Sequence, residues 1–220
     1  MSELTKIKIC GLTRSVDIEY VNELMPDYVG FVFAKSKRRI STQDAAKLIA
    51  GLKPGIKKVG VFVNESIPNL LETARVCRLD VIQLHGSEDL DYCKKLAGYE
   101  VWKSFGLPGT EYAGGKTDGD ADEVCFINFK DIEQYKDFGV LLDTCCKGSF
   151  GGTGKRFDWK AAKGMSSRFF TILAGGITPE NVKEAIETVK PHVVDVSSGV
   201  ETDGHKDFEK IKKLIMNARG

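Results

Sequence analysis

Val59-Gly60-Val61-Phe62-Val63 has no polar side chain, so a strand built from it would be apolar on both of its faces. Strands of this kind belong to parallel sheets that helices cover on both sides. Similar short apolar runs recur along the chain. The first run belongs to a candidate strand that begins at Lys57. The candidate strands are Ile7–Cys10, Tyr28–Phe33, Lys57–Val63, Val81–Leu84, Val101–Phe105, Val140–Asp143, Phe170–Ala174 and Val193–Ser197.

Amphipathic segments lie between these runs and predict helices. Apolar residues recur at helical spacing from Ser15 to Met25, and the segment from Phe208 to Ala218 predicts the last helix. Residues suited to N-caps mark two further helix starts, namely Ser41 or Thr42 and, before a first-turn proline, Thr178. Alternating strands and helices predict an α/β fold, a single (β/α)8 TIM barrel that spans residues 1–220 as one domain. An open doubly wound sheet rarely holds so many βα units in so short a chain.

The fifth βα unit is irregular. Pro108 to Glu123 is rich in glycine and acidic residues, which is typical of a loop exposed to solvent. We therefore expect the fifth helix to be displaced to roughly residues 130–135, or to be very short.

Composition and charge exclude several classes of protein. The 220 residues are 42% hydrophobic and 29% charged, with a net charge of +1, as in an ordinary soluble globular protein. The sequence has neither the basic stripe of a nucleic-acid-binding protein nor a run long enough to cross a bilayer. The N-terminus lacks a signal-peptide core, so we expect a cytoplasmic protein with reduced cysteines. Without an extra apolar stripe, a monomer is the default expectation.

Glycine-rich segments follow three of the predicted strands. In a (β/α)8 barrel the active site lies at the carboxyl ends of the strands, and the loops after strands seven and eight frequently bind phosphate. Glycines let backbone N–H groups approach a phosphate closely, although turns also need glycine. The segments predict a phosphate site that needs no metal, and its candidate residues are Gly152, Gly154, Gly175, Gly176, Ser197, Ser198 and Gly199.

Two residues at strand ends are candidates for acid–base chemistry. Cys10 ends the first predicted strand, where it could also be a small buried apolar residue. Asp143 ends the sixth, where it could also cap the following loop. A carboxyl group at the end of a buried strand needs partners or stays protonated. A thiolate base and a carboxylic acid on opposite sides of a phosphorylated sugar would form a catalytic pair.

An ordered set of short motifs resembles the phosphoribosylanthranilate isomerases of tryptophan biosynthesis. The motifs run over nearly the whole chain, and the set is far more specific than any one of them. They are Lys8-Ile9-Cys10-Gly11-Leu12-Thr13, Gly30-Phe31-Val32-Phe33 with Ser36-Lys37-Arg38, Val59 to Asn64, Gln83-Leu84-His85-Gly86, Leu141-Leu142-Asp143-Thr144, Gly151-Gly152-Thr153-Gly154 with Phe157-Asp158-Trp159, Ala174-Gly175-Gly176-Ile177, and Asp195 to Glu201.

The resemblance implies an Amadori rearrangement of N-(5-phosphoribosyl)anthranilate that needs no cofactor. It implies that Asp143 is the general acid and Cys10 the general base. It also implies that Arg38 holds the anthranilate carboxylate, with Arg39 as an adjacent competitor, and that Asp195 lies near the ribose hydroxyls. Asp195 could equally be bound to backbone. For His85, in the fourth-strand motif, a structural hydrogen bond is favoured over catalysis.

Three alternatives stay open. A related phosphoribosyl isomerase of histidine biosynthesis, or a bifunctional relative, performs the same kind of rearrangement, but typically has aspartate where this chain has Cys10. A lyase or synthase barrel such as indole-glycerol-phosphate synthase would need a lysine and a glutamate at strand ends. A non-catalytic phosphate-binding barrel could act as a thiol sensor.

Overall fold

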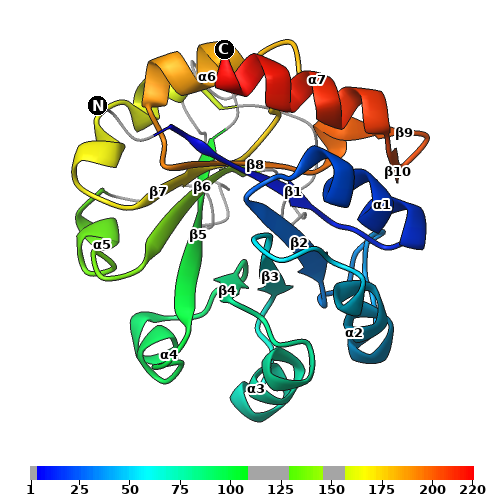
Figure 1. The fold of residues 1–220 in the computed structure, drawn as a ribbon. Helices are drawn as coiled ribbons and strands as arrows, with labels where there is room; N and C mark the ends of the chain where they lie inside the picture. The colour runs from blue at the N-terminus through cyan, green and yellow to red at the C-terminus, as the bar shows by residue number, and fades with distance from the viewer. Residues whose placement is uncertain (1–3, 109–128, 146–156) are drawn as a thin grey trace.

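The computed structural model describes residues 4–108, 129–145 and 157–220. Its eight main strands pair in parallel, each with the next along the chain, and β8 closes on β1. The predicted (β/α)8 barrel is therefore confirmed, with helices around it (Figure 1). The strands are β1 (Lys6–Cys10), β2 (Tyr28–Val32), β3 (Lys57–Phe62), β4 (Val81–Leu84), β5 (Glu100–Pro108), β6 (Gly139–Cys145), β7 (Thr171–Leu173) and β8 (Val193–Val196).

The outer layer consists mainly of α-helices. The α-helices are α1 (Ser15–Leu24), α2 (Thr42–Ala50), α3 (Ile67–Val76), α4 (Leu90–Lys94), α5 (Phe129–Glu133), α6 (Val182–Val189) and α7 (Phe208–Arg219). After β6 the described connection has two 3₁₀ turns instead, η2 (Trp159–Ala162) and η3 (Met165–Ser167). A further 3₁₀ turn, η4 (Ser198–Val200), and the hairpin β9 (Glu201–Thr202) and β10 (His205–Lys206) lie between β8 and α7.

Two predicted N-caps can be compared with the structure. Ser41 is the N-cap of α2, since its side chain accepts a hydrogen bond from the Asp44 N–H. The prediction that Thr178 caps the next helix is wrong, because α6 begins at Val182 after a turn. The Asn181 side chain holds that turn: it accepts from the Thr178 N–H at 2.8 Å and donates to the Gly176 carbonyl at 2.9 Å.

The fifth unit has the short helix that was expected. Helix α5 has five residues, Phe129–Glu133. Strand β5 continues three residues beyond its predicted end, to Pro108. The rest of the predicted loop, from residue 109 to 123, lies outside the described residues.

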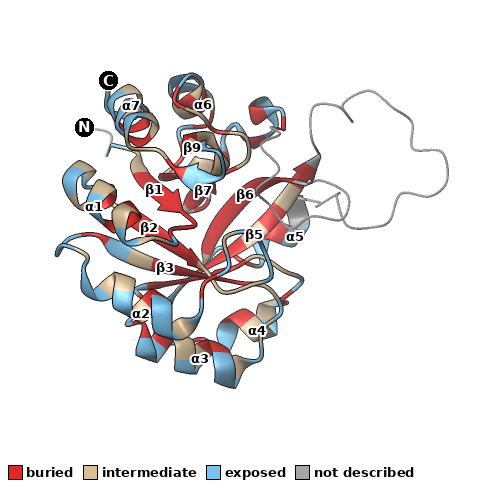
Figure 2. Ribbon diagram, turned by 90° about the vertical axis from the view of Figure 1, so that its right-hand side faces the viewer, coloured by how far each residue is buried: buried red, intermediate tan, exposed pale blue. Residues whose placement is uncertain are grey.

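Apolar side chains fill the end of the barrel where the strands begin. Tyr28 on β2 and Trp102 on β5 are on strands that do not pair, yet their rings are 5.1 Å apart, so both point into the barrel. The same buried cluster includes Val81, Leu141 and Val193. A second, larger cluster packs the outer faces of the strands against the helices, whose outer sides are exposed (Figure 2).

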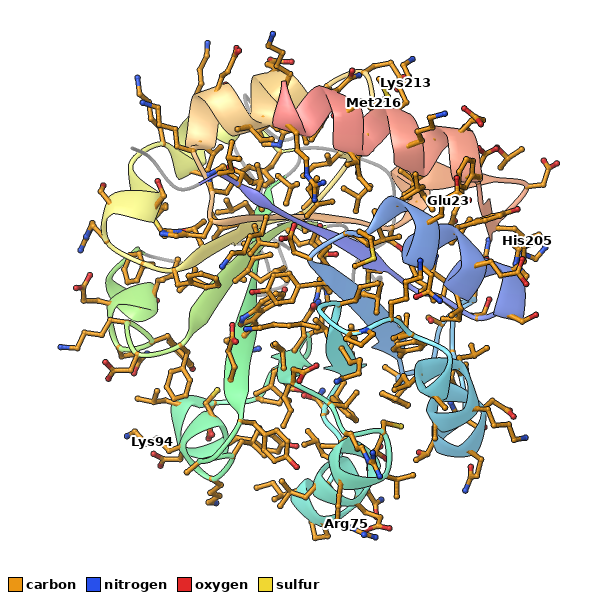
Figure 3. The ribbon with its side chains drawn as sticks, in the orientation of Figure 1. Glu23, Arg75, Lys94, His205, Lys213 and Met216 are labelled. Atoms are coloured by element: carbon orange, nitrogen blue, oxygen red, sulfur yellow. The ribbon has the colours of Figure 1, made fainter. Side chains whose placement is uncertain are left out.

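The helices carry charged residues on the sides that face away from the barrel. Figure 3 shows Glu23, Arg75 and Lys94 pointing outward from α1, α3 and α4. No helix among the described residues is long and apolar enough to span a membrane.

A polar layer follows the apolar interior toward the carboxyl ends of the strands. Successive strand residues point to opposite faces, so a residue two positions later shares the face of its predecessor. Gln83 therefore shares the inner face with Val81, Asp143 with Leu141, and Asp195 with Val193. The register pairs Asp195 with Lys8 on β1. We call Lys8, Gln83, Asp143 and Asp195 the polar layer.

Candidate active site

Lys8 connects the polar layer, although its side chain is fully buried. Its Nζ donates to Asp195 Oδ2 at 2.7 Å and to Gln83 Oε1 at 2.9 Å. Burial alone would lower the pKa of Lys8, but the Asp195 carboxylate and the Cys10 sulfur raise it overall. An ammonium group in such a place needs charged and polar partners to offset the loss of its hydration. Lys8 is thus a fixed positive charge inside the barrel.

Cys10 lies at the end of β1, two residues after Lys8 and on the same face. Its side chain is buried, and Gly30 on β2 leaves the space for it. A β-carbon at position 30 would lie 2.7 Å from the Cys10 Sγ. Burial raises the pKa of the Cys10 thiol, and the Asp195 carboxylate adds to the rise, while the Lys8 ammonium opposes both.

Asp143 lies near the end of β6, and each of its two oxygens has a polar neighbour. Oδ1 accepts from the Thr144 N–H at 2.7 Å, and Oδ2 lies 3.3 Å from His85 Nε2. The other ring nitrogen of His85 lies 3.1 Å from Gln83 Nε2. Asp143 is therefore joined through His85 and Gln83 to Lys8, the residue that also interacts with Cys10.

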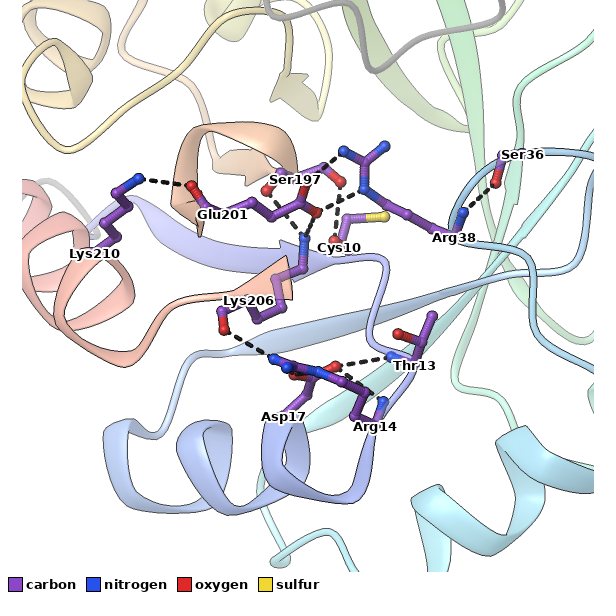
Figure 4. A network of polar contacts seen from close by, with 10 residues as sticks. All are labelled: Cys10, Thr13, Arg14, Asp17, Ser36, Arg38, Ser197, Glu201, Lys206 and Lys210. Carbon is purple, nitrogen blue, oxygen red and sulfur yellow. Dashed lines mark hydrogen bonds and ion pairs between the residues drawn. The ribbon is translucent and has the colours of Figure 1, made fainter. Parts of the chain in front are cut away.

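Arg38 lies beside Cys10 and is paired with a carboxylate (Figure 4). Its Nε and Nη2 donate to the two carboxylate oxygens of Glu201, each at 2.7 Å. The buried Lys206 donates to the same carboxylate at 2.5 Å and to the Ser197 carbonyl at 3.0 Å. The hydrogen bond to Glu201 raises the pKa of Arg38. Arg39, the competitor, is exposed to solvent.

The loops after β7 and β8 meet next to these residues. Gly175 and Gly176 have φ angles of +82° and +64°, a conformation that favours glycine. A β-carbon at Gly175 would overlap the Thr144 hydroxyl, and one at Gly199 would overlap the Ile177 carbonyl oxygen. The Ser197 hydroxyl donates to the Cys10 carbonyl at 3.0 Å.

The structure thus brings Gly175 and Gly176 to Asp143, and Ser197 to Gly199 to the Cys10 side of the barrel. Gly152 and Gly154, the first of the predicted glycine segments, lie outside the described residues.

Two buried oxygen atoms of the site have no hydrogen-bond partner within the described part of the chain. They are Asp195 Oδ1 and Thr144 Oγ1. Buried polar atoms in proteins are normally paired, so each such atom calls for an explanation, of which a bound ligand is one. Both atoms belong to residues at the carboxyl ends of strands, where the candidate site lies.

The described residues contain no group of three or more His, Cys, Asp or Glu side chains that could hold a metal ion. The chemistry that these residues can perform is proton transfer. A buried thiol and a buried carboxyl group both lie toward the carboxyl ends of barrel strands, with a lysine ammonium and an arginine near the thiol.

Three residues of the site were not predicted from the sequence. Lys8 was quoted only as part of a motif, although its place two residues before Cys10 could have indicated a shared face. Glu201 and Lys206 come from the hairpin β9–β10, for which the sequence has no strong strand signal. Only the fold brings them to Arg38, 163 positions away from Glu201 along the chain.

Comparisons with known proteins agree with the resemblance seen in the motifs. The N-(5'-phosphoribosyl)anthranilate isomerase of Thermoanaerobacter pseudethanolicus is 48% identical over 220 residues, 99% of each chain. A crystal structure of phosphoribosyl anthranilate isomerase from Thermotoga maritima is similar with a TM-score of 0.84 at 38% identity, over 99% of this chain and 100% of that one.

A further similar crystal structure is that of a phosphoribosyl anthranilate isomerase in complex with reduced 1-(o-carboxyphenylamino)-1-deoxyribulose 5-phosphate. Its TM-score is 0.79 at 38% identity, over 99% of this chain and 100% of that one. The family described as N-(5'phosphoribosyl)anthranilate (PRA) isomerase matches residues 7–217. The match covers nearly the whole barrel, and the chain therefore belongs to the N-(5'-phosphoribosyl)anthranilate isomerase family.

Proposed function

We propose that this chain catalyses the isomerisation of N-(5-phosphoribosyl)anthranilate to 1-(2-carboxyphenylamino)-1-deoxyribulose 5-phosphate in tryptophan biosynthesis. The observation that carries the proposal, within this family, is that the buried Cys10 and the buried Asp143 both lie toward the carboxyl ends of strands in one closed barrel. The reaction is an Amadori rearrangement, in which an aldose amine becomes a ketose amine. It needs an acid, a base and anchors for two anionic groups.

Asp143 acts first, as the general acid. Its carboxyl proton passes to the ring oxygen of the ribose, and the bond between that oxygen and C1′ breaks. The nitrogen lone pair of the anthranilate forms a double bond to C1′, which leaves a positively charged Schiff base. Asp143 becomes a carboxylate, which the Thr144 N–H stabilises.

Cys10 acts second, as the general base. Its thiolate removes the proton from C2′, and the electron pair neutralises the Schiff base to give an enolamine, which then tautomerises to the ketone. Burial raises the pKa of the Cys10 thiol, which opposes the thiolate form. The positive charge of the Schiff base favours the thiolate, as does the Lys8 ammonium. The thiolate form is therefore most populated when the intermediate that needs it is present.

The remaining residues bind the substrate. Asp195 accepts a hydrogen bond from a ribose hydroxyl at Oδ1, an atom that lacks a partner among the described residues. Arg38 holds the anthranilate carboxylate, because a guanidinium can form paired hydrogen bonds with a carboxylate. Glycine-containing segments after β6, β7 and β8 hold the phosphate through backbone N–H groups. Their residues are Gly152, Gly154, Gly175, Gly176, Ser197, Ser198 and Gly199.

A direct assay tests the function. Purified protein is mixed with phosphoribosylanthranilate, and the fluorescence of the substrate is expected to fall with time. The aminoaldose intermediate of histidine biosynthesis is offered in parallel and is expected not to react. Turnover of that second substrate would show a broader isomerase, and no turnover of either would contradict the proposal.

Arg38→Lys is expected to raise KM by roughly 10–100-fold and to change kcat little. A hydrogen bond to a charged group contributes about 1.5–3 kcal/mol, and lysine cannot reproduce the planar pair of donors. Steady-state kinetics would separate the two constants. Arg39→Lys is the matched control, because that neighbouring side chain is exposed and should leave KM unchanged. If Arg39→Lys raised KM more than Arg38→Lys, Arg39 would be the residue that binds the anthranilate carboxylate.

A further inference from the structure

Lys8 is connected to Asp143 through Gln83 and His85. The donors and acceptors along this series of contacts follow from the chemistry of the groups. An ammonium group can only donate, so the Gln83 atom that faces Lys8 Nζ at 2.9 Å is the amide oxygen. The amide nitrogen of Gln83 then faces His85 Nδ1 at 3.1 Å, and this nitrogen can only donate. His85 Nδ1 is therefore an acceptor and carries no proton.

The tautomer of His85 follows from this direction. A neutral imidazole with a free Nδ1 carries its proton on Nε2. His85 Nε2 lies 3.3 Å from Asp143 Oδ2, so the proton is on the ring nitrogen nearer to the carboxyl group. The positive charge of Lys8 thus determines, through Gln83, which ring nitrogen of His85 carries the proton.

The peptide around His85 holds the ring in place. The backbone N–H of His85 donates to the Phe62 carbonyl at 2.8 Å. Directly after it, the buried Glu88 accepts from the Gly86 N–H at 2.9 Å and from the Asn64 N–H at 2.7 Å. These bonds tie the segment after β4 to β3, so the imidazole is carried on a fixed backbone.

We propose that Lys8, Gln83 and His85 are positioning residues, which hold the Nε2–H tautomer of His85 against Asp143 and so orient the catalytic carboxyl group. This inference rests on the proposed function, in which Asp143 is the acid. The Thr144 N–H donates to one carboxyl oxygen, and His85 Nε2 lies 3.3 Å from the other. Lys8 lies two residues before Cys10 on β1, and its charge opposes the rise in the pKa of the Cys10 thiol.

Nitrogen-15 NMR of histidine-labelled protein tests the tautomer directly. The chain has only three histidines, and His85→Asn identifies the signals of His85. The expected result near neutral pH is a protonated Nε2 and an unprotonated Nδ1. A protonated Nδ1 in the wild type would overturn the proposal. The NMR measurement needs no substrate, so its result does not depend on whether the activity assay supports the proposed function.

Gln83→Glu reverses the direction of the hydrogen bonds. A carboxylate cannot donate, so His85 Nδ1 must become the donor, and the NMR signals should move to a protonated Nδ1. We expect kcat to fall by up to about 100-fold, the effect of a small misplacement of a catalytic group, with KM nearly unchanged. A purely structural role would lower stability but would leave the tautomer as it is, and that outcome would contradict the proposal.

Two further variants complete the test. Gln83→Met removes the donor without adding a buried charge and nearly preserves the side-chain length, so it should fold even if Gln83→Glu does not. It should give a mixture of the two His85 tautomers, whereas a pure Nε2–H signal would mean that Gln83 does not set the tautomer. Gln43→Glu is the matched control: it makes the same chemical change at an exposed position of α2 and should alter neither the NMR signals nor kcat.

Discussion

Cys10→Ser is expected to lower kcat by about 10²–10⁴-fold while the protein still binds its substrate, because it removes the general base. A serine hydroxyl ionises far less readily than a thiol, so the variant has almost no anionic oxygen that could take the proton from C2′. The loss corresponds to about 3–5 kcal/mol of transition-state stabilisation. The substitution preserves the shape of the side chain, and Gly30 leaves space for either atom. Single-turnover kinetics on phosphoribosylanthranilate, with substrate binding measured separately, would check this.

Cys77→Ser is the matched control for this substitution. Cys77 is also buried, but its Sγ contacts the Thr42 carbonyl at 3.5 Å in the outer layer of helices. Its replacement should leave kcat and KM unchanged. If Cys10→Ser kept the activity of the wild type, Cys10 would not be the base. If neither the wild type nor the variant turned over substrate while both bound it, the thiol-sensor alternative would gain support.

The pH dependence of kcat/KM for the wild type is a second test of Cys10 as the general base. A substrate that already carries an open-chain ribose does not need the acid Asp143. On that substrate the base works as a thiolate, so kcat/KM should fall as the pH falls through the pKa of Cys10 in the free enzyme. Burial raises the pKa of Cys10, so the activity should level off only above about 8.5, the ordinary value for a thiol. A profile that is already level well below that range would contradict the role of this buried thiol.

The fold was predictable because buried strands leave a strong signal. Runs such as Val59 to Val63 are apolar on both faces, and only a parallel sheet covered by helices accommodates several of them in one chain. The beginning of α6 was misjudged because Thr178 and Pro179 fit a helix start equally well in sequence. The hydrogen bonds of Asn181 with Thr178 and Gly176 delay the helix, and such contacts are invisible without coordinates.

The site was predictable only where a residue's position at a strand end carried the information. Cys10 and Asp143 end their predicted strands, so a closed barrel places them at the same end of the molecule. The partners of a side chain could not be predicted in this way, because they depend on the register between strands. Lys8 meets Asp195 across the β1–β8 pair, and Arg38 meets Glu201 from a hairpin that has no clear sequence pattern. The raised pKa of Cys10 follows from such contacts and from burial, and it also could not be read from the sequence.

Asp143→Asn is expected to lower kcat by about 10²–10⁴-fold, since an amide cannot give a proton to the ring oxygen of the ribose. The variant should still bind substrate, because Asp195, Arg38 and the glycine-containing segments are unchanged. It should also be less stable by about 1–3 kcal/mol, the cost of leaving a buried polar group unsatisfied. The amide oxygen can face either the Thr144 N–H or the His85 N–H, so its nitrogen faces the other donor.

Asp91→Asn is a suitable control for Asp143→Asn, because it makes the same change on the exposed surface of α4, where the carboxylate lies 3.5 Å from Lys94 Nζ. It should leave kcat unchanged and alter the free energy of unfolding by less than about 0.5 kcal/mol. Rapid-mixing kinetics adds a sharper reading. A substrate that already carries an open-chain ribose no longer needs its ring opened, so Asp143→Asn should slow it much less than it slows phosphoribosylanthranilate. Equal losses on both substrates would place the function of Asp143 after ring opening and would contradict its assignment as the acid of the first step.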